Sequence, residues 1–88
     1  MKVIKRNGTL ENYQKCKLLN SIQKAVYLEC FTNYELTLPD KISNYLTNKY
    51  EKKGKTLLSS QIKRDVIREL IKSGVYEISK VYEIGGFN

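Results

Sequence analysis

The chain contains no histidine, and this absence excludes several kinds of site. Without an imidazole base, neither a Ser–His nor a Cys–His nucleophile system can be assembled. Its two cysteines, Cys16 and Cys30, are too few to form a structural zinc site without histidine ligands. Their spacing matches no disulfide or metal framework. We therefore expect no structural metal.

Long apolar runs are also missing. The longest is the four-residue stretch 25–28, far short of the roughly 20 residues that cross a bilayer. Residues 1–6 lack the apolar segment of a signal peptide. The sequence therefore predicts a cytoplasmic protein that does not associate with membranes.

Motifs of common enzyme sites are absent as well. The nine acidic residues are scattered, and no spacing among them implies a pair of catalytic carboxylates. There is no Walker-type loop and no G-x-G-x-x-G motif. The Lys-Lys-Gly-Lys run at 52–55 lacks a leading glycine, and we interpret it as the C-terminal end of a helix, where cations are favoured. We predict that the chain is not an enzyme.

What the chain does have is an excess of positive charge in a single small domain. Its 88 residues have room for one core, so we predict one domain over 1–88. It carries 16 Lys and Arg against 9 Asp and Glu. Residues 1–24 hold six basic groups and one acid, and residues 49–72 hold eight and three. Two basic zones favour a polyanionic partner, although solubilising lysines on helix surfaces explain the second zone equally well.

The first thirteen residues are typical of a β-hairpin. Asn7-Gly8 is the strongest two-residue turn signal, because both central residues of a type I′ turn need a positive φ. The flanking segments 2–6 and 9–13 contain residues that strands accept. A two-stranded hairpin is barely stable alone, so we expect it to pack against the rest of the chain.

Four helices are predicted after the hairpin. The first runs from Gln14 to about Glu29 and is followed by a connection at 32–34. The second is capped by Thr37, carries Pro39 in its first turn and ends before Gly54. The third is capped by Ser59 or Ser60 and ends at 73–74, and the fourth covers roughly 76–84. The positions expected to face inward are Leu18, Ile22, Ala25, Val26, Ile42, Tyr45, Leu46, Lys49, Ile62, Val66, Leu70, Ile71, Ile78, Val81 and Tyr82.

These elements define an α+β fold, an N-terminal β-hairpin packed on a bundle of about four helices. Lys5 and Arg6 lie beside the hairpin turn, Glu11 is on the return strand and Lys17 is one turn into the first helix. A hairpin closing over a helix start can bring such cations together around phosphates. Adjacent strand residues point to opposite faces, however, so a solvated basic hairpin remains open as an alternative.

A family resemblance favours the phosphate site. The segment Val3-Ile4-Lys5-Arg6-Asn7-Gly8, followed by Glu11, Tyr13 and Lys17, resembles the opening signature of the ATP-cone family. The similarity continues through Ser59-Ser60-Gln61-Ile62 and the closing segment 73–82, and spans about residues 3–84. It implies allosteric binding of ATP or dATP, with Mg²⁺ as a companion ion, between the hairpin and the helices.

The resemblance also implies roles for individual residues. Lys5, Arg6 and Lys17 would hold phosphates, and Glu11 would contact the sugar. Gln14 and Leu18 would border the base, and Ser59 and Lys63 would line the pocket from the third helix. With Val3, these nine positions form the expected nucleotide-binding set.

The family further implies a regulatory role. Its domains resemble the sensor of ribonucleotide reductases and part of the repressor of their genes, so we expect either an excised domain or a stand-alone cone acting in trans. The expected partners are nucleotide, a ribonucleotide reductase or its regulator, and further copies in a homo-oligomer. Two alternatives stay open: a small DNA-binding or transcription-regulating protein using residues 49–72, and an interaction adaptor without a nucleotide. Under the leading hypothesis, we expect the chain to bind nucleic acid only weakly and without sequence preference.

Overall fold

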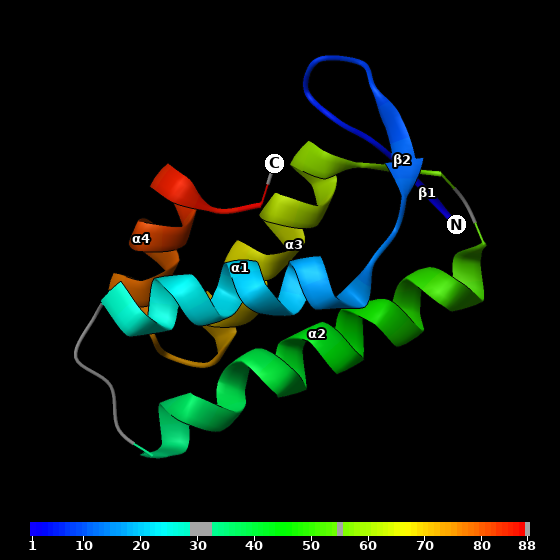
Figure 1. Ribbon diagram of the computed structural model, residues 1–88. Helices are drawn as coiled ribbons and strands as arrows, with labels where there is room; N and C mark the ends of the chain where they lie inside the picture. The colour runs from blue at the N-terminus through cyan, green and yellow to red at the C-terminus, as the bar shows by residue number, and fades with distance from the viewer. Residues whose placement is uncertain (29–32, 55, 88) are drawn as a thin grey trace.

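A computed structural model describes residues 1–28, 33–54 and 56–87 (Figure 1). In these ranges a small three-stranded sheet at one end of the molecule is joined to four helices, which confirms the α+β fold and the hairpin-on-bundle architecture. The elements are β1 (Lys2–Ile4), β2 (Leu10–Asn12), α1 (Lys15–Leu28), α2 (Asn33–Lys53), β3 (Leu57–Leu58), α3 (Ser59–Lys72) and α4 (Tyr76–Gly85).

The hairpin forms where it was predicted, but its turn differs. The Gly8 N–H donates to the Lys5 carbonyl and the Lys5 N–H donates to the Thr9 carbonyl, each at 2.9 Å. Only Gly8 in this loop has a positive φ, at 84°, so the predicted two-residue type I′ turn is wrong. The loop has three residues and ends in a left-handed glycine, a common hairpin connection. Asn7 instead uses its side chain, which accepts the Thr9 N–H at 3.0 Å.

The third strand was not predicted. β3 pairs in parallel with β1, Val3 opposite Leu57 and Ile4 opposite Leu58, so β1 is the central strand. α3 begins directly after this strand. Its N-cap is Leu58, in extended conformation and with no side-chain hydrogen bond, so the predicted serine cap is wrong. Pairing with β1 fixes the backbone at 57–58, and Ser59 becomes a buried residue of the first helical turn.

The helices supply most of the core, and most of the predicted inward positions are confirmed. Three of them are wrong: the side chains of Tyr45 and Ile71 are 52% and 40% exposed, and Lys49 is only half-buried and lines two surface depressions. The second helix also begins earlier than predicted, at Asn33, which puts Pro39 in its interior instead of its first turn. The predicted end of the first helix, Glu29, lies outside the described residues. The buried apolar set is Val3, Leu18, Ile22, Ala25, Val26, Leu38, Ile42, Leu46, Tyr50, Leu57, Ile62, Val66, Leu70, Ile78 and Tyr82.

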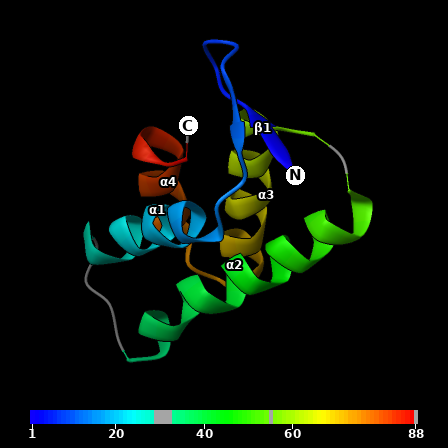
Figure 2. The ribbon, with the colours of Figure 1, turned by 45° about the vertical axis from the view of Figure 1, so that its right-hand side comes forward.

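The way the four helices pack against one another brings the end of α4 near the hairpin. α1 packs against α2 on one side and α4 on the other, and α3 packs against α2 and α4. Both ribbon views show the chain leaving α4 and turning back beneath the hairpin loop (Figures 1 and 2). Residues 86–87 share a depression there with Lys5 after β1, Glu11 of β2 and Lys17 of α1.

Two hydrogen bonds, one buried and one partly buried, tie α2 to its neighbours. The Tyr50 hydroxyl donates to the Asp65 carboxylate of α3 at 2.7 Å, and burial together with this contact raises the pKa of Tyr50. Tyr13, just after β2, is 2.7 Å from the Thr47 hydroxyl and packs edge-on against the Tyr50 ring. The hairpin is thereby anchored to the long helix. None of the helices in the described part of the chain is both long and apolar enough to span a bilayer.

Candidate functional site

Glu11 is the centre of the charge cluster beneath the hairpin. Its carboxylate on β2 lies 3.6 Å from the Lys5 ammonium and 3.3 Å from the Lys17 ammonium of α1. Partial burial alone raises the pKa of Glu11, but the hydrogen bond and charge of Lys17, with a contribution from Lys5, hold it below its usual value. One carboxylate thus serves two cations, which leaves the cluster with a formal positive charge.

These three side chains line a depression of about 250 Å³. Lys24, two helical turns after Lys17, adds a second cation from α1 and the third of this depression. Asn20 and Ser21 lie between the two lysines on the same face. The opposite wall is formed by residues 85–87, which begin at the last residue of α4. The depression therefore joins the hairpin, α1 and the C-terminal segment.

Arg6 and Lys63 meet in a second depression of about 240 Å³. Arg6 comes from the hairpin loop, and Lys63 comes from the second turn of α3. Residues 85–87 line this depression too. Lys5 and Arg6 are adjacent in the chain, so their side chains point to different sides and line different depressions. Residues 85–87 form the wall that both depressions share. We call the two depressions together the hairpin cleft.

The segment 85–87 is held in place by Tyr82. The Gly86 N–H donates to the Tyr82 carbonyl at 2.7 Å, and the Phe87 backbone hydrogen-bonds the Tyr82 hydroxyl. A Cβ on Gly86 would collide with that carbonyl and would lie 2.7 Å from the Tyr82 ring, so only glycine fits so closely. Phe87 is partly buried against the core.

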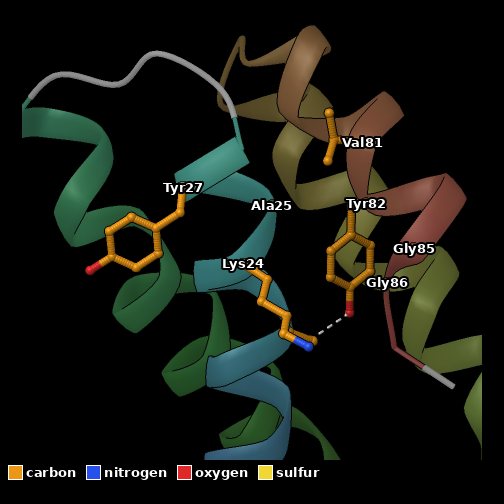
Figure 3. A pocket seen from close by; sticks show the side chains of 8 residues that line it. Lys24, Ala25, Tyr27, Val81, Tyr82, Gly85 and Gly86 are labelled. Carbon is orange, nitrogen blue, oxygen red and sulfur yellow. Dashed lines mark hydrogen bonds between the residues drawn. The ribbon is translucent and has the colours of Figure 1, made fainter.

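A third, more apolar depression continues from the cleft between α1 and α4. It has a volume of about 430 Å³ and shares Ser21, Lys24 and residues 85–86 with the first depression. Figure 3 shows the Tyr82 ring between the two helices, with its hydroxyl at the end nearest Lys24. That hydroxyl is 3.0 Å from Ser21, and burial raises the pKa of Tyr82 to about 12.

Five of the nine predicted site residues line the hairpin cleft: Lys5, Arg6, Glu11, Lys17 and Lys63. Val3, Leu18 and Ser59 are buried and line none of these depressions. Gln14 is exposed before α1, where its side-chain oxygen faces the Cys16 thiol at 3.9 Å. Sequence reasoning missed Asn20, Ser21 and Lys24, although their helical spacing from Lys17 places all four on one face.

This arrangement has the chemistry that an anion needs. Ammonium and guanidinium groups from the hairpin, α1 and α3 surround a polar cleft with amide and hydroxyl donors nearby. Within the described ranges, no three His, Cys, Asp or Glu side chains come together in a way that could hold a metal ion. The fold and cleft define a small α+β domain with a cation-lined cleft.

A comparison with protein families identifies the module. The model of the ATP cone domain matches residues 1–84, nearly the whole chain, so this protein belongs to the ATP-cone family. Membership implies a nucleotide-sensing regulatory module. A search among the curated proteins finds no significant match.

Proposed function

We propose that the chain binds ATP or dATP in the hairpin cleft and regulates a partner through the occupancy of that site. The observation that carries the proposal is the convergence of Lys5, Arg6, Lys17 and Lys63 on the two depressions that flank residues 85–87. These four cations come from three separate elements, so the fold itself assembles the cluster. A triphosphate needs several such donors, with lysine acting as a point charge and arginine as a fork.

Glu11 has a defined part in this proposal. In the empty site it neutralises Lys5 and Lys17 at 3.6 and 3.3 Å. When phosphates approach, they compete for the same two ammonium groups and repel the carboxylate. Glu11 is then free to accept a hydrogen bond from a sugar hydroxyl, the role that the family resemblance implies.

The size of the cleft suggests how binding is transmitted. Neither depression, at about 250 and 240 Å³, reaches the roughly 300–1,000 Å³ that is usual for small-molecule sites. Nucleotide that contacts both sets of cations has to displace residues 85–87 from between them. Since a ligand shifts an equilibrium only through its differential affinity for two states, this displacement supplies the second state that regulation requires.

The regulated partner completes the proposal. By family resemblance it is a ribonucleotide reductase or the regulator of its genes, and occupancy controls activity or the assembly of a homo-oligomer. Mg²⁺ would accompany the phosphates as the companion ion that the family resemblance implies. The proposed setting is the cytoplasm, where ATP and dATP are available, and the chain contributes no catalytic step.

Calorimetric titration with ATP and dATP, followed by light scattering of each complex, tests this function. We expect saturable binding with one or both nucleotides and a change in molecular mass or shape on binding. No heat and no stabilisation with either nucleotide would favour the nucleotide-free adaptor instead.

A further inference from the structure

A second basic surface lies on the other side of α3 from the hairpin cleft. It is made by Lys49, Lys52 and Lys53 of α2 with Arg64 and Arg68 of α3. Two adjoining depressions of about 330 and 510 Å³ occupy it, and both are lined by Lys49 and Lys53. Lys63 faces the hairpin cleft while its neighbour Arg64 faces this surface, because successive helical residues point about 100° apart.

The charges of this surface are unbalanced. Among the described residues, no ion pair joins any of its five cations to an acid. The one carboxylate lining the surface, Asp65, is 8% exposed and already accepts the Tyr50 hydroxyl. Uncompensated like charges destabilise a small domain by mutual repulsion, and a polyanion removes that repulsion.

An exposed aromatic ring lies beside these cations. Tyr45 was expected in the core, yet it is 52% exposed and lines the larger depression together with Lys49 and Lys52. Tyr45, Lys49 and Lys53 are spaced four residues apart on one face of α2, and Arg64 and Arg68 repeat that spacing on α3. The result is two rows of cations with an aromatic platform at one end.

We propose that this surface binds single-stranded nucleic acid, without sequence preference, by its phosphodiester backbone and by stacking of a base on Tyr45. Cationic grooves that carry exposed aromatics bind single strands in this way, because every base offers a face to stack. Arginine and lysine rows contact successive phosphates, and the polar side chains of Ser60 and Gln61 at the edge supply further donors. An acidic protein segment satisfies the charges equally but gives no role to the exposed ring.

Fluorescence anisotropy with labelled oligothymidylate, measured over a range of salt concentrations, tests the proposal. We expect affinity in the range of roughly 10⁻⁴ to 10⁻⁶ M that falls steeply as salt rises. The double variant Lys49→Gln/Arg68→Gln is expected to make the slope of log affinity against log salt shallower by about 1.4. The matched control is Lys15→Gln/Lys80→Gln, which removes the same charge from exposed positions on α1 and α4. Equal losses in the two variants would show diffuse attraction and overturn the proposal.

The stacking contact is tested separately. Tyr45→Ala keeps the charge and is expected to weaken oligothymidylate binding at least about fivefold while leaving duplex binding unchanged. Melting curves of each variant check that folding is intact. An unchanged affinity for single strands, or tighter binding of polyglutamate than of oligothymidylate at the same salt, would overturn the assignment. ATP titration of the same variants is expected to be normal, which separates this surface from the hairpin cleft.

Discussion

The Glu11 carboxylate lies 3.3 Å from the Lys17 ammonium, and this contact joins the hairpin to the first helix at the proposed nucleotide site. The same carboxylate also neutralises Lys5. A nucleotide therefore enters a site whose cations are already gathered but share a single internal anion. Such preorganisation reduces the cost of ordering long side chains on binding.

Removal of a single lysine of the proposed phosphate site is expected to weaken the binding of ATP or dATP roughly 10- to 100-fold. A charge-assisted hydrogen bond contributes about 1.5–3 kcal/mol, so Lys5→Ala and Lys17→Ala should both show this loss by calorimetry. The melting temperature of the empty protein should barely change, because exposed ion pairs add little to folding.

Lys52→Ala and Lys53→Ala are the matched controls for that experiment, since they remove the same charge from the exposed end of α2. They should leave nucleotide affinity nearly unchanged. Equal weakening by all four substitutions would mean diffuse attraction and would end the claim of a specific cleft.

Saturating nucleotide is expected to raise the melting temperature. At a concentration of about 100 times Kd, ligand linkage adds about 2.7 kcal/mol to the free energy of unfolding. For a domain of this size the shift is roughly 10–20 °C, which differential scanning fluorimetry measures directly. An unmoved melting temperature with both ATP and dATP would contradict the sensor function.

Loosening the segment 85–87 is expected to strengthen nucleotide binding. In Gly86→Ala the new methyl group collides with Tyr82 and displaces the segment from the cleft. Because apparent affinity scales with the fraction of open molecules, we expect Kd to fall roughly 3- to 10-fold. In Gly85→Ala the methyl group meets no atom within 4 Å, so this variant is the control. A Kd for Gly86→Ala equal to that of Gly85→Ala, or higher, would show that the segment does not cover the site.

Tyr50→Phe is expected to destabilise the fold. It removes the donor of the 2.7 Å hydrogen bond and leaves the buried Asp65 carboxylate without that partner. The expected loss is about 1–3 kcal/mol, or roughly 4–8 °C in melting temperature per kcal/mol. Asp65→Asn in the Tyr50→Phe background removes the stranded charge, and we expect it to recover part of the loss in chemical denaturation. No recovery would mean that the substituted phenyl ring packs badly and that the hydrogen bond is not the cause.

Alkaline pH is expected to destabilise the protein through its buried tyrosines. Burial raises the pKa of Tyr82 from 10.0 to about 12, so the folded state retains a proton that the unfolded state loses. The contribution is therefore fully present below about pH 10 and is lost as pH rises toward 12, up to about 2–3 kcal/mol. In denaturation experiments at a series of pH values, the free energy of unfolding should fall less steeply above pH 10 for Tyr82→Phe than for the parent protein. Parallel declines would contradict a buried, neutral Tyr82.

Most helices and turns of this protein could be predicted from local sequence patterns. The apolar period of three to four residues identified the helix faces with Leu18, Ile22 and Val26, because burial of one face is the main stabilising term for an amphipathic helix. Gly8 marked the hairpin and Gly54 the end of α2 for the same kind of local reason. The charge pattern placed Lys5, Glu11 and Lys17 near one another and left a solvated hairpin open, and only the family resemblance assigned them to a phosphate site.

The tertiary structure decided what depends on contacts between distant segments. The strand β3 has only two residues, too few to show a period, and it exists because β1 offers a free edge 54 residues earlier in the chain. That pairing sets the start of α3 and buries Ser59, whereas the side chains of Tyr45 and Ile71 stay exposed because none of the described elements covers them. The placement of residues 85–87 between the two halves of the cation cluster also follows from packing, through the Gly86 contact with Tyr82. Local sequence determined which helices and turns form, and long-range packing determined which of their side chains meet at the cleft.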